Sequence, residues 1–311
     1  MKYKRILSIY NSLRYTYSTL VKNDPKGLEL EWFSTIDTPF EYEENGVDFL
    51  ENSIQEFKNQ FELVKDKVDG ISIVFPAELI MVSQFPIEED VQEEDIRSLL
   101  NIEITKAFPT LDIQNFVIYS YRLEKRADNQ DILMCVIYPK IDINRYEELF
   151  SNYNKEIISL NVSQISAANC FLYNYPEYRN TVSAIVGIQG NFVDFTILKN
   201  SKILYYNLLS YQQDVDIPQI LTNEILKVNE SIINKIDNGL FCYGEDLNDG
   251  LFNEIKESLT LIGVGTHKLN AFRMMRANFN EKEIDYCKRN MHIFPPVIGA
   301  SFPSFFEALT F

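Results

Sequence analysis

The sequence predicts an α/β protein that contains two copies of one folding unit. Its 311 residues suffice for about two domains of ordinary size. Hydrophobic residues make up 46% of the chain and charged residues 24%, which is the composition of a globular protein. One order of elements, namely three strands, a helix, a glycine turn and a strand, occurs over 6–75 and again over 183–243. The fold class is therefore α/β with an internal duplication.

The first copy begins with strands, because residues 6–21 are rich in β-branched and aromatic side chains on both sides of an Asn11-Ser12 turn. A third strand is expected over 28–36. An amphipathic helix follows, and after Gly70 a buried strand is expected over 71–76. The helix is indicated by apolar residues at spacings of three and four, which are Val47, Leu50, Ile54, Phe57, Phe61 and Val64.

A second region of strands and helices separates the two copies. A strand over 80–86 precedes an acidic segment at 88–95, which we interpret as the solvated start of a helix that ends before Pro109, and not as a metal site. The remaining elements expected here are strands over 115–123, 132–137 and 156–162, a helix around 146–153 and a helix over 163–173.

The second copy repeats the order of the first. Its expected elements are strands over 182–188, 192–198 and 203–209, a helix over 217–236, a strand over 240–244, a helix over 247–259 and a strand over 260–264. A period this long indicates a duplicated domain and not a solenoid of short repeats. We divide the chain into a first core (1–79 and 161–180), an inserted α+β subdomain (80–160) and a second core (181–311).

Composition excludes several classes of partner. Lys and Arg number 29 against 45 Asp and Glu, a net charge of −16, which disfavours nucleic acid and anionic membrane surfaces. The four cysteines are isolated from one another, as in a reduced cytoplasmic protein. We find no signal-peptide core and no stretch of 18 apolar residues, so we expect no direct insertion into a membrane.

The motifs of common catalytic and metal sites are missing. His267 and His292 have no ligand-spaced Cys or His neighbour, so we expect no zinc site. There is no phosphate-binding GxxxxGK[ST] loop and no GxSxG nucleophile turn. The Gly263-Val264-Gly265 stretch is interpreted as a turn or strand end, because two spaced glycines are a weak signal for phosphate binding.

The duplicated unit with an insertion after Pro76 resembles the actin/Hsp70/sugar-kinase superfamily, and within it the bacterial actin-like proteins of the FtsA and PilM type. The order and spacing of local segments resemble PilM over nearly the whole chain. These segments are 85–86, 94–103, 108–109, 131–137, 269–272 and 298–300. The resemblance implies a duplicated actin-like, ribonuclease H-like fold.

The resemblance also implies a function. PilM-like proteins are cytoplasmic scaffolds of type IV pilus machines that bind ATP and hold a short tail of a membrane partner, PilN. The cytoplasmic domain of GspL in type II secretion is similar in fold. By this resemblance we expect a cytoplasmic protein that is attached to the inner membrane through a PilN-like partner. Assembly into homo-oligomers is a further expectation. Fold alone does not carry such a function.

The sequence departs from ATP-binding members of the superfamily at the phosphate turns. Those members carry an Asp-x-Gly turn in each copy, but here the first reads Ser8-Ile9-Tyr10 and the second Gly187-Ile188-Gln189. The turn on the adenosine side keeps only Gly244, followed by two carboxylates. Both catalytic carboxylates are lost and two bulky side chains are added. We therefore expect a pseudo-ATPase with no nucleotide cofactor, no metal and no catalytic residue.

Two functional hypotheses follow. The first is a non-catalytic scaffold that binds the cytoplasmic tail of a membrane protein in a groove between the first core and the insertion. Candidate anchors for that tail are Phe85, Ile102, Phe108 and Phe116, although each also fits an ordinary core position. A basic cluster is a further candidate contact, or else a solvated helix face, and comprises Lys268, Arg273, Arg276, Lys282, Lys288 and Arg289.

The second hypothesis is a divergent actin-fold ATPase or kinase with unusual phosphate loops. Its remaining candidate acids are Asp194 and Glu224. This hypothesis requires an open cleft between the two copies, with Tyr10 and Gln189 pointing away from it.

Overall fold

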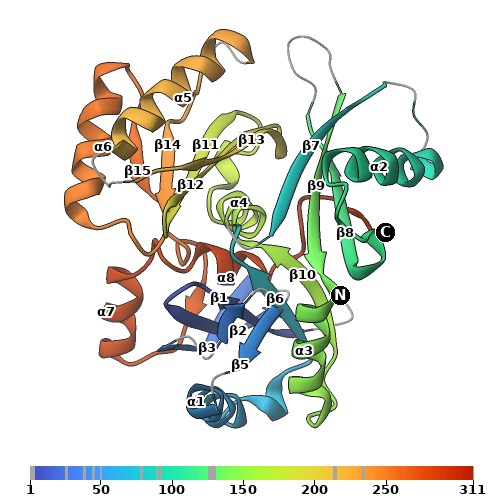
Figure 1. The fold of residues 1–311 in the computed structure, drawn as a ribbon. Coiled ribbons are helices and arrows are strands. Elements are labelled where there is room, and N and C mark those ends of the chain that lie inside the picture. The colour runs from blue at the N-terminus through green and yellow to red at the C-terminus, as the bar shows by residue number, and fades with distance from the viewer. Residues whose placement is uncertain are drawn as a thin grey trace.

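Two lobes and an inserted subdomain surround a central helix (Figure 1). The structure is a computed structural model that describes residues 4–24, 27–37, 40–43, 46–49, 51–77, 80–88, 91, 93–124, 131–212, 216–232 and 235–310. The first lobe and the second lobe each contain one large mixed sheet.

The first sheet has six strands, in the order β10-β6-β1-β2-β3-β16. Their bounds are Ile157–Val162 (β10), Gly70–Phe75 (β6), Arg5–Asn11 (β1), Tyr15–Asp24 (β2), Gly27–Asp37 (β3) and Arg276–Ala277 (β16). Strand β1 is antiparallel to β2 and parallel to β6, which is parallel to β10 in turn.

The second sheet has the same pattern in the order β13-β12-β11-β14-β15. Its strands are Lys202–Ser210 (β13), Phe192–Lys199 (β12), Val182–Gln189 (β11), Leu240–Tyr243 (β14) and Thr266–Lys268 (β15). Here too the first three strands in sequence, β11, β12 and β13, are antiparallel to one another in that order. Strand β14 then pairs in parallel with β11, and β15 pairs in parallel with β14. The duplicated α/β fold predicted from the element order is confirmed.

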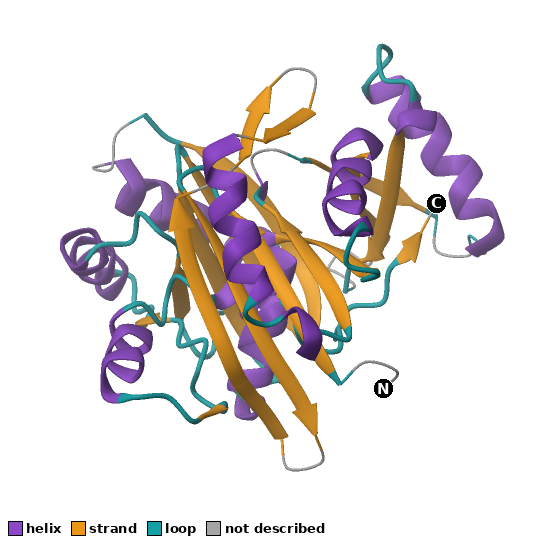
Figure 2. Ribbon diagram, turned by 90° about the horizontal axis from the view of Figure 1, so that it is seen from below, coloured by secondary structure: helices purple, strands orange, loops and turns teal. Residues whose placement is uncertain are grey.

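Each sheet is covered by helices on its outer face. Helices α5 (Ile217–Ser231) and α6 (Asp249–Leu261) pack on Ala184, Val186 and Ile188 of β11, which alternate along the strand as the two-residue period requires. Helix α1 (Glu51–Glu62) covers the outer face of the first sheet through Phe57 and Phe61. Figure 2, seen from below, looks onto the strands of this sheet with helices lying across them.

The inserted subdomain is a four-stranded sheet with one helix. The strand order is β17-β8-β9-β7, and the elements are Leu309–Thr310 (β17), Phe116–Arg122 (β8), Asp131–Pro139 (β9), Met81–Ile87 (β7) and Glu93–Ala107 (α2). Helix α2 packs on this sheet through Ile96, Leu100 and Ile104.

Strand pairing joins the parts that the sequence-based division separates. Strand β10 pairs with β6 in the first sheet, although residues 157–160 fall in the segment assigned to the insertion. Strand β16 pairs with β3 of the first lobe, and β17 pairs with β8 of the insertion, although both fall in the segment assigned to the second core. The division into domains stays a prediction.

The other elements are short or connect these layers. They are the hairpin β4 (Phe40–Glu43) and β5 (Gly46–Phe49), helices α3 (Lys140–Ser151), α4 (Ser163–Asn174), α7 (Glu281–Arg289) and α8 (Pro295–Gly299), and 3₁₀ turns at Lys65–Lys67, Ile113–Asn115 and Pro176–Tyr178. In the part of the chain that the structure describes, no helix has the length and apolar content needed to cross a membrane.

Two sequence predictions are wrong in detail. The helix expected from Val47 begins at Glu51, because 46–49 pairs with 40–43 in a hairpin. The strand expected over 260–264 is instead the last two residues of α6 and the turn after it, and the edge strand is 266–268. Gly263, with φ +76°, ends the helix through a bond from its N–H to the Thr260 carbonyl, so the Gly263-Gly265 stretch is a helix stop.

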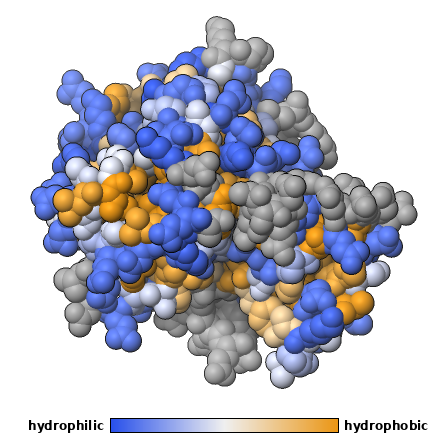
Figure 3. Space-filling model, turned by 90° about the horizontal axis from the view of Figure 1, so that it is seen from above, coloured by the Kyte–Doolittle hydropathy of each residue, from blue (hydrophilic) through white to orange (hydrophobic). Residues whose placement is uncertain are grey.

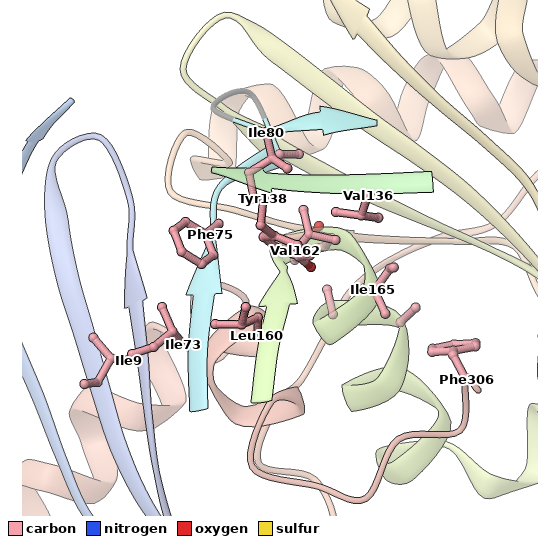
Figure 4. Close-up of a cluster of buried hydrophobic side chains, with 14 of the residues drawn as sticks. Ile9, Ile73, Phe75, Ile80, Val136, Tyr138, Leu160, Val162, Ile165 and Phe306 are labelled. Carbon is pink, nitrogen blue, oxygen red and sulfur yellow. The ribbon is translucent and has the colours of Figure 1, made fainter. Parts of the chain in front are cut away.

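Helix α4 occupies the centre of the molecule. Eleven of its twelve residues are buried, all except Tyr173. Figure 4 shows Ile165 of this helix among side chains from the first sheet, the insertion and the last segment, including Phe75, Tyr138 and Phe306. Helix α8 lies so close to α4 that a Cβ on Gly299 would stand 1.7 Å from the carbonyl oxygen of Ser166. Only glycine permits this approach.

Replacing Gly299 by Ala should lower the free energy of unfolding by about 3 kcal/mol or more, because backbone atoms of α4 must move to admit the methyl group. Urea unfolding followed by circular dichroism measures this change. The matched control is Gly265→Ala, where the new Cβ would meet only an imidazole nitrogen at 3.6 Å and should cost less than about 1 kcal/mol. Equal stability of the two variants would contradict the proposed tightness of the α4–α8 contact.

Candidate functional site

The β1–β2 turn of the first lobe faces the β11–β12 turn of the second lobe. The first turn is closed locally by Ser12. Its N–H donates to the Tyr15 carbonyl at 2.9 Å, and its hydroxyl oxygen accepts from the backbone N–H groups of Arg14 (3.2 Å) and Tyr15 (2.9 Å). The turn is therefore fixed by its own hydrogen bonds before any contact with the second lobe.

A direct hydrogen bond joins the two predicted phosphate turns. The hydroxyl of Tyr10 donates to Oε1 of Gln189 at 2.6 Å, and both side chains are buried. Tyr10 also stacks on Tyr17 of β2, with ring centroids 6.1 Å apart. Sequence reasoning singled out both Tyr10 and Gln189, and the structure brings them together between the lobes. Ser8 precedes Tyr10 by two residues on β1. Its hydroxyl forms a 2.7 Å hydrogen bond with the hydroxyl of Ser301, which follows α8.

A second cluster fills the space beside Gly187. Asp194 accepts from the N–H of Gly187 at 3.2 Å and from the hydroxyl of Tyr243 at 2.8 and 2.9 Å. A Cβ at position 187 would stand 2.1 Å from a carboxylate oxygen of Asp194 and 2.5 Å from the Tyr243 ring. Burial beside Asp194 raises the pKa of Tyr243 well above its ordinary value, so its hydroxyl keeps the proton that it donates. The place where an aspartate side chain would begin is thus already occupied.

Gly244 has a structural reason to be glycine. Its φ is +122°, and a Cβ there would lie 2.1 Å from the Ile188 carbonyl oxygen. Its N–H donates to the carbonyl of His292 at 2.9 Å. The glycine lets the segment after β14 approach β11 closely, and its N–H is already engaged by a protein carbonyl.

Charged groups complete the contact between the lobes. Arg14, at the tip of the first-lobe turn, forms a 2.7 Å ion pair with Asp246, which also accepts from the N–H of Gly190 at 2.7 Å. The Glu245 carboxyl lies against Ser12 and Tyr17 of the first lobe. Burial raises the pKa of Glu245 to about 7, while the neighbouring hydroxyls of Ser12 and Tyr17 oppose that rise. Sequence reasoning noted these two acids only as groups that repel an anion and missed their part in joining the lobes.

The candidate acids of the enzyme hypothesis do not share a site. Glu224 of α5 accepts from the Tyr205 hydroxyl and from Asn207, on the face of the second sheet that packs on α5. Asp194 is adjacent in sequence to Phe195, which pairs with Asn207 in the sheet. Because alternate residues of a strand point to opposite faces, Asp194 and Glu224 lie on opposite sides of the sheet.

Three of the four candidate partner anchors belong to the core beneath α2. Phe85 is buried, and Phe108 and Phe116 are half-buried against the same cluster as Ile96 and Leu133. Ile102 differs, since 51% of it is exposed on α2. The partner role of these residues stays a prediction, and Ile102 is the one whose exposure suits it.

The basic cluster is largely neutralised by neighbouring carboxylates. The ion pairs are Lys268–Asp249 (2.6 Å), Arg273–Glu177 (2.5 Å), Arg276–Asp24 (3.1 Å) and Arg289–Asp285. This pairing favours the solvated-face interpretation over a cationic docking patch.

Within the described residues, no three His, Cys, Asp or Glu side chains gather closely enough to hold a metal ion. His267 is exposed and stacks on Phe241, whereas His292 is buried, and burial lowers its pKa to about 4. Of the acidic segment at 88–95, residues 89, 90 and 92 lie outside the described residues.

A groove opens beside the inserted sheet, and sequence reasoning assigned no role to most of its lining. Its volume is ≈ 410 Å³, and it lies between the end of β8, the start of β13 and the last segment of the chain. Its walls include Tyr121, Arg122, Lys202, Phe305 and Leu309. Seen from above, the surface elsewhere is mostly hydrophilic with separate hydrophobic patches (Figure 3).

Comparison with solved structures shows the class of fold. The chain is similar to a structure described as the PilM–PilN type IV pilus biogenesis complex, with a TM-score of 0.76, 13% identity, and coverage of 96% of this chain and 99% of that chain. It is also similar to a Bacteroides thetaiotaomicron protein of unknown function with an actin-like ATPase fold, with a TM-score of 0.53, 14% identity, and coverage of 86% and 91%.

The chain therefore has the actin-like fold, and its resemblance to the PilM type is confirmed at the level of fold. No protein-family model matches the sequence, and no curated protein matches it either.

Tyr10 and Gln189 should be energetically coupled through the hydrogen bond between their side chains. Tyr10→Phe removes a donor from a buried amide oxygen and should cost about 1–3 kcal/mol of unfolding free energy. In Tyr10→Phe/Gln189→Leu, both polar partners are gone, so the double variant should cost less than the sum of the single variants. Urea unfolding of the four proteins measures the coupling, and strict additivity would contradict the bond.

Glu245 should make stability depend on pH. Its pKa is 4.5 ordinarily and about 7 in the folded protein, so the folded state holds this proton more tightly. The stability it contributes is complete below about pH 4.5 and is lost as the pH rises to 7. The difference in unfolding free energy between the Glu245→Gln variant and the native protein should therefore shift in favour of the variant between pH 4.5 and pH 8. The expected shift is about 2 kcal/mol, a value reduced to allow for partial solvent access.

Urea unfolding at pH 4.5, 6 and 8 checks this effect. The matched control is Glu257→Gln, on the exposed face of α6, which should leave the pH profile of stability unchanged. A Glu245→Gln profile parallel to that of the native protein would show that this carboxyl titrates normally.

Proposed function

We propose that this chain is an actin-fold scaffold of a cell-envelope machine of the type IV pilus or secretion type, working without nucleotide turnover. The observation that carries the proposal is the closed contact between the lobes. Tyr10 bonds Gln189 directly, and Asp194 with Tyr243 fills the space beside Gly187. Nucleotide would have to enter where these buried side chains meet.

The physical argument against ATP binding has two parts. A phosphate chain needs bare backbone N–H groups and compensating positive charge at its turns. Here the N–H groups of Gly187, Gly190 and Gly244 already donate to protein oxygens. Two carboxylates, Asp194 and Asp246, accept two of these bonds, so negative charge stands where phosphate would need to approach.

The proposed partner is the cytoplasmic tail of a PilN-like inner-membrane protein. The likeness in fold to the PilM–PilN complex supports this choice, as does the groove beside the inserted sheet. A protein with this role would act in the cytoplasm, at the inner membrane, through its partner. Assembly into homo-oligomers stays a prediction.

The alternative of a divergent ATPase or kinase receives less support from the geometry. It needs Tyr10 and Gln189 to point away from the space between the lobes, whereas each points at the other. It also needs two acids at one site, whereas Asp194 and Glu224 lie on opposite faces of a sheet.

Millimolar ATP·Mg²⁺ should leave the thermal unfolding of the pure protein unchanged. Nucleotide present at about 100 times its Kd would add about 2.7 kcal/mol and raise Tm visibly. Differential scanning fluorimetry with and without ATP·Mg²⁺ makes the measurement, with AMP·Mg²⁺ as the control for non-specific effects. A clear rise with ATP alone would overturn the proposal in favour of the ATPase alternative.

A further inference from the structure

Two phenylalanines anchor the last segment of the chain to the body of the molecule. Phe306 is buried in the central cluster, where Figure 4 shows it beside α4. Phe305 packs edge-on against Tyr173 with ring centroids 5.5 Å apart, and the Arg179 guanidinium lies 4.7 Å from its ring centre. These contacts hold the segment against the first lobe.

Beyond Phe306 the segment crosses to the inserted sheet and adds a very short strand. Strand β17 pairs with β8 through two positions, Leu309 with Ser120 and Thr310 with Tyr119. Strand β8 is seven residues long and pairs with β9 along its whole length on the other side. On this edge the described part of the last segment therefore uses two of the seven β8 residues.

The groove lies where the last segment separates from β8. Tyr121 and Arg122 follow the paired Ser120 along β8, and they line the ≈ 410 Å³ groove together with Phe306 and Glu307 on the opposite wall. Because the pairing is antiparallel, a strand that also kept to the sheet edge over the two residues before the Leu309 position would run through this groove. It would form more main-chain hydrogen bonds than β17 does.

The register of β17 shows which side chains this edge accepts. Leu309 packs toward α2 with the cluster of Ile96, whereas Ala308 packs on the opposite side with the central cluster. The two cations at the groove already have acidic partners in the protein, since Arg122 pairs with Asp131 at 3.3 Å and Lys202 with Glu124 at 3.8 Å. The register therefore selects an apolar residue at the Leu309 position.

We propose that the β8 edge is the docking site for an extended partner peptide, and that residues 307–310 hold this edge until the partner displaces them. The peptide adds as an antiparallel strand with an apolar side chain at the Leu309 position, and its preceding residues lie beside Tyr121 and Arg122. Main-chain hydrogen bonds supply the affinity and the alternating side chains supply the selectivity. This inference rests on the proposed function as a protein-binding scaffold. It adds where the partner binds and which segment of the chain competes with it.

Competition by the chain's own segment follows from its tether. A short flexible tether gives an attached strand an effective concentration on the order of millimolar. A free peptide at micromolar concentration cannot compete with it unless it pairs over a longer stretch. Removing residues 307–311 should therefore expose the edge without disturbing Phe305 and Phe306.

The test uses the chain's own strand as the probe. A fluorescent peptide with the sequence of residues 303–311 is titrated to millimolar concentration against the full chain and against a chain ending at Phe306. The truncated chain should bind the peptide at least about tenfold more tightly. The matched control peptide carries Leu309→Asp and should lose this binding. Circular dichroism and Tm confirm that the truncated chain is folded.

Three outcomes would overturn the proposal. The first is a folded, truncated chain that binds neither peptide, and the second is one that binds both peptides equally. The third is a full chain that elutes as a dimer from gel filtration and becomes a monomer on truncation, because the natural occupant of the edge would then be the last segment of a second copy. None of these readouts involves nucleotide, so failure here is distinguishable from failure of the proposed function.

Discussion

The close packing of α8 on α4 is the contact on which the rest of the molecule depends. Helix α4 is buried on almost every side, and it meets the first sheet, the second sheet and the last segment of the chain. Gly299 brings the α8 backbone against Ser166, and Asn169 of α4 bonds the carbonyl of Gly299 at 2.8 Å. Because protein interiors are close-packed, a change in this one spacing is transmitted to both lobes.

Two sets of contacts thus hold the two lobes in one relative position. One set is made by α4 and α8, and the other by the turns. The Tyr10–Gln189 bond and the Arg14–Asp246 ion pair join the turns directly. Protein side chains thus bridge the lobes at these turns. Tyr10 and Gln189 are buried polar groups, and their mutual hydrogen bond gives each of them a partner.

The inserted subdomain has a different kind of connection to the rest. Its sheet receives a strand from the last segment of the chain, which reaches β8 after crossing the first lobe at Phe306. Gln84 of β7 also donates to the Tyr206 carbonyl of β13 at 2.7 Å, so the insertion touches the second lobe. A partner strand bound at this edge would therefore lie between the insertion and the start of β13 in the second lobe.

The sequence by itself determined the duplicated order of elements, because strand alternation and helical spacing are local patterns that burial on one face imposes. It also identified Tyr10 and Gln189 as departures from phosphate-binding turns, and Gly244 as the one glycine kept in the third turn. Only the tertiary structure decided that Tyr10 meets Gln189, that Asp194 fills the space beside Gly187, and that Phe85 is core while Ile102 is exposed. These contacts join residues up to 179 positions apart. No local pattern encodes them, since they depend on how whole sheets pack across α4.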